Sequence, residues 1–412
     1  MPANSGKTEK TYKYPETPSR KEAKLNIMKT ETVKGFNDFS GEDAVKRAEI
    51  KKILICEFEK YGFEPAETPV IEYEEFVKGE NERDDAVSDI FKLRDKGDRK
   101  LALRYEFTFQ LKRLAKNKKL PYRRYQIGEV FRDEPVSGNR FRQFTQCDVD
   151  IIGSGLKEEA EILALTKDIL EKLGIKFTIY INNRKLLNEI LDELKIKEKE
   201  KAIKDIDKLD KLTENEVRAN LKKYRAEKIL LVLKKPESYF KKYESYKDIE
   251  ELKKYCKYYD VNVNFLPSLA RGLSYYNGNV FEVKTKEMKE TVIGGGSYEV
   301  NGVSSTGISF GLDRLSMLAK INYDKKNVMI ISINQDKEAI KLANNLRNKG
   351  IICMLSYGKI SKALEYANSQ GIGRVIFIGG DEVKKKKIKL RDMKTGKESL
   401  VSEKDLIRSL GK

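Results

Sequence analysis

Histidine is absent from this chain of 412 residues. Its absence excludes Ser-His-Asp and Cys-His catalytic triads, HExxH metal sites and imidazole proton shuttles, all of which need that side chain. The sequence also lacks a GxxxxGK[ST] phosphate loop and a GxGxxG turn after a strand, so any nucleotide must be bound by another arrangement. The chemistry therefore has to depend on carboxylates, arginines, hydroxyls and bound ions.

Cysteine is scarce. Cys56, Cys147, Cys256 and Cys353 are far apart and form no CxxC pair, which argues against a zinc knuckle and against a disulfide framework. No apolar run approaches the length of a membrane span, and the N-terminus lacks the hydrophobic stretch of a signal peptide. These absences predict a soluble protein of the cytoplasm.

Positive charge, by contrast, is in excess. The chain has 83 basic and 65 acidic side chains, which gives a formal net charge of +18. This excess favours a polyanionic partner such as nucleic acid, although solubility accounts for part of it. The length predicts two or three domains.

The hydrophobic pattern divides the chain into five segments. Residues 1–27 are polar and lysine-rich, which predicts a disordered tail or leader. Hairpin-like alternation in residues 88–155 and sheet-like stretches at 269–283 and 291–300 predict an antiparallel sheet. We expect one α+β domain, formed by residues 28–184 and 263–324. Residues 185–262 read as a helical insertion, and strands alternate with helices in 325–412, which predicts a small α/β domain. In that last segment the lysine run 384–387 is expected in a solvated hairpin.

The stretch "FRDE" contains the first candidate site residues. Arg132, projecting from a strand, can bind a phosphate through two parallel hydrogen bonds, which lysine cannot match. Glu134, on the same face, can accept from an adenine amino group. The alternative is a solvated surface cluster, because Arg-Asp-Glu groups are common on protein surfaces.

A second candidate is "NRFRQFTQCDVDIIG". Arg140, Arg142, Phe144, Gln146, Asp148 and Asp150 alternate, so all six would fall on one face of a single strand. Such a polar face on an otherwise apolar strand is costly unless it lines a polar pocket.

The third candidate is Arg271 in "LARGLSYYNGNVFEV". A salt bridge within a hairpin is the structural alternative, but the neighbours Ala270, Gly272 and Leu273 are uncharged, which favours a role on a ligand. The glycines 294–296 would allow close backbone approach to that ligand, or form a flexible turn.

Together these segments resemble the histidyl-tRNA synthetases, class II aminoacyl-tRNA synthetases, over residues 30–412. The segment around Pro69 resembles class motif 1, "FRDEPVSGNRFRQF" motif 2, and "GISFGLDRL" motif 3. "ARGLSYYNGNVFE" and "GGGSYE" resemble the family's signature segments RGLDYYTGTVFE and GGGRYD, with departures at Ser274, Asn277 and Ser297. "TQCDVD" is closer to the archaeal and eukaryotic branch than to the bacterial one.

The resemblance implies the roles of particular residues. It implies that ATP is bound by Arg132, Glu134, Arg140, Phe144 and Arg314. It implies that histidine is bound by Glu106, Thr108, Gln146, Asp150, Arg271, Tyr275 and Tyr276. Arg132, Arg271 and Arg314 would be catalytic, and Mg²⁺ would accompany ATP without a resident metal site.

The implied reaction is ATP-dependent formation of histidyl-adenylate, followed by transfer to the 3'-terminal ribose of tRNA-His. The 133–141 loop would meet the acceptor end, residues 325–412 would bind the anticodon, and Pro69 would mark a homodimer interface. Two alternatives remain: a non-catalytic paralogue that regulates histidine biosynthesis, and an RNA-binding protein that forms no adenylate.

Overall fold

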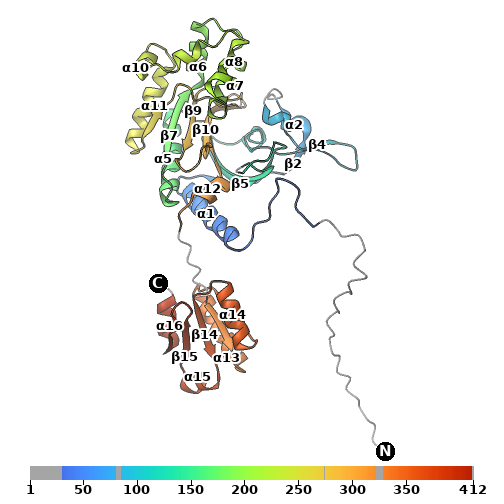
Figure 1. Cartoon of the computed structure of the whole chain (residues 1–412), viewed down its shortest axis with the longest axis vertical. Helices are drawn as coiled ribbons and strands as arrows, with labels where there is room; N and C mark the ends of the chain where they lie inside the picture. Colours follow the sequence, from blue (N-terminus) through green and yellow to red (C-terminus); the bar gives the residue numbers. More distant parts are fainter. Residues whose placement is uncertain (1–29, 80–84, 139, 273, 322–327, 411–412) are drawn as a thin grey trace, which may run out of the picture. The chain divides into compact units, whose positions relative to one another are not determined.

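The structure, a computed structural model, describes residues 30–79, 85–138, 140–272, 274–321 and 328–410. The chain forms two compact units that divide after Ile321, and each has its own hydrophobic core (Figure 1). The predicted tail, residues 1–27, lies outside the described residues.

An eight-stranded sheet organises the first unit. Its central pairs are antiparallel, as the hairpin pattern predicts, whereas the two outermost pairs, β1 with β5 and β7 with β8, are parallel. In spatial order the strands are β1 (Glu64–Pro65), β5 (Tyr122–Phe131), β6 (Gln143–Ile152), β11 (Val303–Gly311), β10 (Ile293–Val300), β9 (Asn279–Lys284), β7 (Thr178–Asn183) and β8 (Val263–Phe265).

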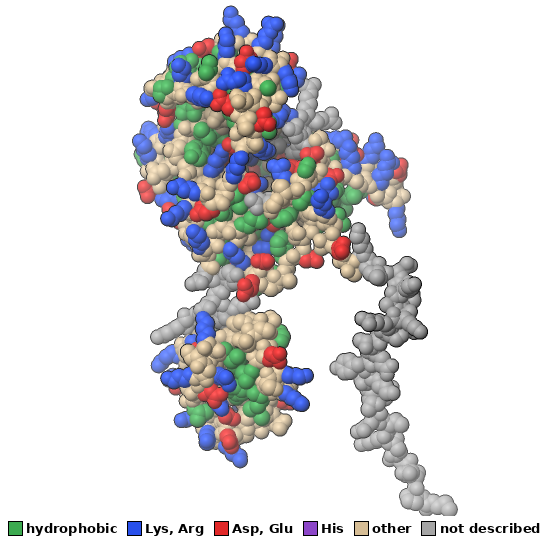
Figure 2. All heavy atoms as spheres, in the orientation of Figure 1, with side chains coloured by type: hydrophobic (Ala, Val, Ile, Leu, Met, Phe, Trp, Pro, Cys, Tyr) green, Lys and Arg blue, Asp and Glu red, His purple; other side chains and the backbone are tan. Residues whose placement is uncertain are grey.

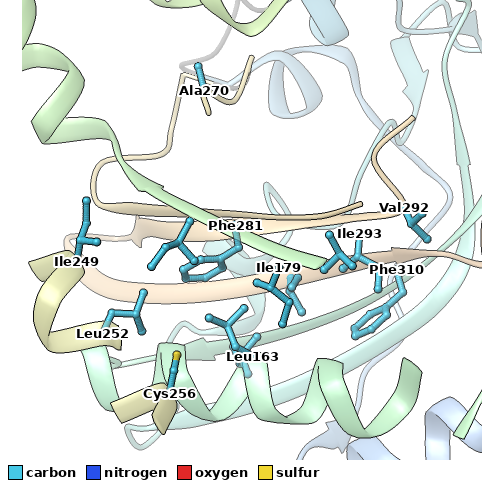
Figure 3. Packing of buried hydrophobic residues seen from close by; sticks show 14 of the residues in the cluster. Leu163, Ile179, Ile249, Leu252, Cys256, Ala270, Phe281, Val292, Ile293 and Phe310 are labelled. Carbon is cyan, nitrogen blue, oxygen red and sulfur yellow. The ribbon is translucent and has the colours of Figure 1, made fainter. Parts of the chain in front are cut away.

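One face of this sheet is covered by helices and is apolar. Helix α5 (Leu156–Lys172) places Leu163 against the sheet, near Phe281 of β9, Ile293 of β10 and Phe310 of β11 (Figure 3). The other helices of this layer are α1 (Gly41–Lys60), α11 (Tyr246–Tyr258) and α12 (Leu312–Leu318). Because side chains alternate across a strand, the opposite face of the sheet is left for polar groups.

Strand β6 shows this division clearly. Cys147, Val149 and Ile151 belong to the apolar core, so Gln146 and Asp148 point to the other face.

The helical segment between β7 and β8 is part of the first unit. Its apolar residues belong to the same core cluster as the sheet. In Figure 1 α6, α8, α10 and α11 gather at one end of the unit, beside β7. The segment consists of α6 (Arg184–Glu193), α7 (Lys199–Asp207), the 3-10 helix η1 (Lys208–Asp210), α8 (Glu214–Lys222), α9 (Ile229–Val232), α10 (Glu237–Phe240) and α11.

A three-stranded antiparallel sheet precedes β5 in the chain. It orders β2 (Ile71–Tyr73), β4 (Lys100–Leu103) and β3 (Lys92–Arg94). The short helices around it are α2 (Glu74–Lys78), α3 (Asp85–Ser88) and α4 (Leu111–Leu114).

The second unit is a five-stranded mixed sheet with apolar clusters on both faces. Its strands run β13 (Cys353–Ser356), β12 (Val328–Ser332), β14 (Arg374–Ile378), β15 (Ile388–Asp392) and β16 (Glu398–Val401). Its helices are α13 (Asp336–Asn348), α14 (Ile360–Ser369), α15 (Gly380–Lys385) and α16 (Glu403–Leu410). The expected hairpin at 384–387 is wrong: the run closes α15, and Lys386 terminates that helix in the left-handed conformation, with φ 49°.

Candidate active site

A cavity of about 670 Å³ lies on the polar face of the large sheet. Segments far apart in the sequence reach it, from the residues before α4 to those on α12. Eleven of the predicted site residues line it, namely Glu106, Thr108, Arg132, Glu134, Arg140, Gln146, Asp150, Arg271, Tyr275, Tyr276 and Arg314.

Phe144 does not line the cavity. Its ring lies beneath the guanidinium of Arg132, with Cζ 5.2 Å from the ring centroid. The ring can therefore stabilise the guanidinium of Arg132 through a cation–π interaction.

Arginines dominate one end of the cavity. Arg132 follows the last residue of β5, and its Nε donates to the carbonyl oxygen of Tyr105 at 3.1 Å. Arg314, on α12, donates to the carbonyl oxygen of Thr291. Burial lowers the pKa of Arg314, and Arg140, Arg132 and Arg271 lower it further. Several cations that repel one another in one cavity favour a polyanion there.

The arrangement around motif 2 differs from the prediction. Strand β6 begins only at Gln143, because its pairing with β5 ends at Phe131, so Arg140 and Arg142 lie before the strand. Arg140 closes a tight turn with Ser137 and reaches the cavity, where Nη1 lies 3.0 Å from Glu134 Oε2. Arg142 instead pairs with Asp133 at 3.1 Å and is not among the lining residues. The strand face that lines the pocket therefore contains Gln146, Asp148 and Asp150, but neither arginine.

Arg271 does form a salt bridge, contrary to the argument from its sequence neighbours. Its Nη1 lies 3.0 Å from Oε1 of Glu282 on β9. Its Cζ also lies 5.8 Å from the ring centroid of Tyr276. Glu282 is eleven residues away in the chain, so the uncharged sequence neighbours of Arg271 could not indicate whether this salt bridge forms. Since Arg271 also lines the cavity, pairing and ligand contact are compatible.

The three glycines belong to strand β10, not to a turn. They approach other parts of the protein closely, and Gly294 also lines the cavity, so close approach to a ligand stays a prediction. A Cβ on Gly294 would lie 2.2 Å from Nη1 of Arg271, and one on Gly295 would lie 2.2 Å from the carbonyl oxygen of Gly307. Gly296 has φ +157° and faces the carbonyl oxygen of Asn279. The glycines thus make room for Arg271 and for neighbouring backbone.

The opposite end of the cavity is acidic. Asp150 Oδ2 lies 2.8 Å from Nη2 of the fully buried Arg124, and Asp150 also accepts a hydrogen bond from the hydroxyl of Tyr298. Asp148 is buried beside it. Burial, and next the charge of Asp150, raise the pKa of Asp148 to about 7.

Two acceptor atoms at this end have no donor among the described residues. They are Oδ1 of Asp148 and Oε1 of Gln146, whose Nε2 donates to Ser309 Oγ at 2.7 Å. Buried acceptors without partners are costly unless a ligand supplies N–H groups.

A tyrosine hydroxyl in the cavity hydrogen-bonds a carboxylate that is predicted to bind histidine. The hydroxyl of Tyr275 donates to Oε2 of Glu106 at 3.1 Å. Burial, and next the charge of Glu106, raise the pKa of Tyr275 far above its ordinary value. The phenol therefore stays protonated and keeps donating to that carboxylate.

Several lining residues were missed from the sequence. Glu282 and Tyr298 stand within the signature segments, so their position was a usable signal. Arg124 does not line the cavity but pairs with Asp150 behind it, and the sequence gave no sign of this role, because an arginine in a strand usually reaches solvent. Asp207 and Asp210 lie in a lysine-rich helical stretch whose composition gives no sign of a site.

Ser297, which stands where the family signature GGGRYD has Arg, hydrogen-bonds a buried carboxylate. Its hydroxyl donates to Oε1 of Glu159 at 2.5 Å, and Nδ2 of Asn279 donates to Oε2 at 2.7 Å. Among the described residues, no cation is paired with Glu159: its hydrogen-bond partners are Ser297 and Asn279. Burial raises its pKa to about 7.

Comparison with known proteins agrees with this geometry. The family model described as "Histidyl-tRNA synthetase" matches residues 35–315, and "Anticodon binding domain" matches residues 327–412. The chain belongs to the histidyl-tRNA synthetase family. The family and the class II fold, an α+β catalytic unit followed by an anticodon-binding domain, are therefore confirmed.

Individual relatives cover nearly the whole chain. Histidine--tRNA ligase 1 of Bacillus cereus (strain ATCC 14579) is 34% identical over 93% of this chain and 100% of its own. The crystal structure of histidyl-tRNA synthetase from Nostoc sp. PCC 7120 is 27% identical, covers 94% of this chain and 99% of its own, and has a TM-score of 0.80. Assignment to the archaeal and eukaryotic branch stays a prediction.

The regulatory alternative has a structural neighbour too. A structure described as an ATP phosphoribosyltransferase regulatory subunit/histidyl-tRNA synthetase from Bacillus halodurans C is 21% identical, with a TM-score of 0.71 over 83% of this chain and 97% of its own. At that identity the likeness shows the shared synthetase fold alone.

Proposed function

We propose that this protein activates L-histidine with ATP, forms histidyl-adenylate and transfers the histidyl group to the 3'-terminal ribose of tRNA-His. The observation that carries the proposal is a single cavity with arginines at one end and unsatisfied acceptors at the other. An amino acid and a nucleotide together have the complementary charges.

The activation step needs no proton shuttle. A carboxylate oxygen of histidine forms a bond to the α-phosphorus of ATP, and the bond between that phosphorus and the bridging oxygen breaks to release pyrophosphate. The nucleophile is already an anion, so the protein has only to orient it and to stabilise charge on the phosphate oxygens. Arg132, Arg271 and Arg314 supply that charge, which explains how a chain without histidine can catalyse the step.

The acidic end is suited to histidine. Glu106 and Gln146 are proposed to accept from the α-ammonium group, with Thr108 beside them, and Asp150 to accept from an imidazole N–H. A buried pocket that hydrogen-bonds a polar ring discriminates strongly against analogues without the ring nitrogens, because its own groups would stay unpaired.

At the arginine end, Glu134 is proposed to accept from the adenine amino group. Mg²⁺ is proposed as the counterion of ATP. This ion usually keeps several waters and takes only one or two protein carboxylates beside substrate phosphates. Glu290 lines the cavity and would supply one such ligand.

The tRNA is proposed to use both units. The 133–141 loop would contact the acceptor end, and the second unit would bind the anticodon as unstacked bases. Figure 2 shows Lys and Arg side chains (blue) interspersed with Asp and Glu (red) over the visible face of the helical segment.

A homodimer is proposed at the segment around Pro69. Pro69 is exposed, and the adjoining apolar side chains of Val70, Ile71 and Tyr73 are 38%, 49% and 53% exposed. Apolar groups gathered on a surface mark association sites.

No helix among the described residues is long and apolar enough to cross a membrane. A cytoplasmic location stays a prediction.

Histidine-dependent exchange of pyrophosphate into ATP, followed by aminoacylation of tRNA-His, tests the function. Arg271→Ala should reduce exchange by about 10²–10³-fold, the usual effect of removing one donor that stabilises developing charge. Arg123→Ala is the matched control, because Arg123 pairs with Glu161 and does not line the cavity. A regulatory paralogue, or a protein that only binds RNA, would show no exchange even in the wild type.

A further inference from the structure

The helical segment contributes one wall of the cavity. Asp207 ends α7, Asp210 ends the following 3-10 helix, and Lys211 comes next; all three line the cavity. None of them was anticipated from the sequence. This wall places the carboxylates of Asp207 and Asp210 in the same cavity as Arg271, the arginine proposed to act at the α-phosphate.

Asp207 lies against the loop that holds this arginine. A Cβ on Gly272 would be 3.0 Å from Oδ2 of Asp207, so the carboxylate lies against the residue that follows Arg271. The charge of Arg271 lowers the pKa of Asp207, although burial, the largest cause, raises it to about 6 overall. The two side chains are therefore coupled electrostatically.

A series of ionic contacts also connects the helical segment to Arg271. Lys284 Nζ lies 2.8 Å and 2.9 Å from the two carboxylate oxygens of Asp210. Lys284 also lies 3.7 Å from Glu282 Oε2, and Glu282 binds Arg271. Glu282 and Lys284 are two residues apart on β9, so they share one face of the strand. The helical segment thus contacts residues near Arg271 at two points: Asp207 lies against Gly272, and Asp210 pairs with Lys284.

We infer that Asp207 is a positioning residue for Arg271, which holds the guanidinium and its loop in the orientation that the proposed adenylation requires. The inference rests on the proposed function for its chemical consequence only. It assigns to the helical segment a direct part in ordering the active site.

Stability alone does not account for a carboxylate at this position. Ala202, Ile203 and Ile206 already anchor α7 in the core, each with no exposed surface. A carboxylate next to them pays for desolvation, which is why its pKa is raised, and a neutral amide of the same shape would avoid that cost. Among the charged groups that act on Asp207, Arg271 has the largest effect and lowers its pKa; Lys211 also lowers this pKa, whereas Glu282 and Asp210 raise it.

Asp207→Asn tests the inference, with Asp205→Asn as the matched control. Asp205 lies on the same helix and is buried, but it binds Lys208 Nζ at 2.8 Å and does not line the cavity. Loss of the charge at 207 should lower kcat for pyrophosphate exchange by about 10–100-fold, the effect of a misplaced catalytic group, and change the KM for histidine much less. Asp205→Asn should leave kcat near the wild-type value.

The pH profile separates positioning from a structural effect. Asp207 is charged above about pH 6, so the ratio of wild-type to Asp207→Asn kcat should be largest at pH 8 and fall towards one below pH 6. A ratio that does not change with pH, a kcat unaffected by Asp207→Asn, or an equal loss in Asp205→Asn would overturn the inference.

A second measurement does not depend on catalysis. Amide hydrogen exchange of the peptide that spans residues 269–276 should be faster in Asp207→Asn than in the wild type or in Asp205→Asn. Unchanged exchange would refute the positioning role even if the wild type formed no adenylate. Absence of pyrophosphate exchange in the wild type, by contrast, would refute only the proposed function.

Discussion

The guanidinium of Arg271 lies directly against the backbone of Gly294. A Cβ at position 294 would lie 2.2 Å from Nη1, 2.6 Å from Cζ and 2.8 Å from Nη2 of Arg271, so no other residue fits without moving the arginine. The two signature segments of the family therefore meet here: the glycine of one makes the space that the arginine of the other occupies.

Gly294→Ala should accordingly behave as a mutation of Arg271. The methyl group displaces the guanidinium from the cavity, and we expect histidine-dependent pyrophosphate exchange to fall by about 10²-fold or more. Gly97→Ala is the control, since a Cβ there would meet its nearest neighbour, Oδ1 of Asp95, at 3.5 Å. Wild-type activity in Gly294→Ala would show that the arginine adapts freely and that its observed position is not required.

The buried pair of Arg124 and Asp150 predicts a pH effect. Arg124 lowers the pKa of both Asp148 and Asp150, so Arg124→Gln should raise both values further. A larger fraction of each carboxyl group would then be protonated, and a protonated carboxyl group accepts fewer hydrogen bonds. The KM for histidine should rise at least about tenfold at pH 7, the effect of about 1.4 kcal/mol, and recover partly at pH 9.

Arg123→Gln is the matched control for this measurement. Arg123 points to the other face of β5 and pairs with Glu161 at 2.7 Å, where both side chains are partly exposed. Breaking the buried pair should cost ~3–5 kcal/mol in the free energy of unfolding, against ~1 kcal/mol or less for the outer pair. An unchanged KM in Arg124→Gln would contradict the assignment of Asp150 to substrate recognition.

Glu159 predicts that stability depends on pH in an unusual direction. Its pKa is about 7 in the folded protein and 4.5 ordinarily, so the folded state binds the proton more tightly. The stabilisation is complete below pH 4.5 and is lost as the pH rises through 7. Glu159→Gln keeps the shape and hydrogen-bonding capacity without the charge, so it should be more stable than the wild type at pH 8 by ~2–3 kcal/mol.

Denaturant unfolding at pH 5 and pH 8 measures this difference, which should nearly vanish at the lower pH. Glu171→Gln, an exposed position on the same helix, should show no such dependence. A variant less stable than the wild type at pH 8 would mean that the Glu159 charge is compensated by groups other than Ser297 and Asn279.

The division after Ile321 predicts that the two units fold separately. Because the second unit has apolar clusters on both faces of its own sheet, a fragment of residues 322–412 should unfold cooperatively on heating. The fragment 1–321 should retain pyrophosphate exchange and lose most tRNA charging. Non-cooperative melting of the smaller fragment would show that it depends on contacts with the first unit.

Local patterns were sufficient for much of the architecture. Alternation in residues 88–155 predicted antiparallel pairing, and the β-α alternation after Tyr323 predicted the mixed sheet. The pattern failed where strand pairing set the boundary: β6 begins only at Gln143, because β5 ends opposite it at Phe131, which leaves Arg140 and Arg142 outside the strand. A run of alternating residues cannot show where its partner strand ends.

The amino-acid sequence by itself limited the chemistry available to this protein: without histidine it depends on carboxylates, arginines, hydroxyls and bound ions, and its motifs identify the family and eleven of the residues that line the cavity. Only the tertiary structure decided how those arginines are held. Gly294 and Glu282 contact Arg271 from other strands, and Asp207 of the helical segment lies against the neighbouring Gly272, since a folded chain brings a buried charge together with partners that sequence distance does not reveal.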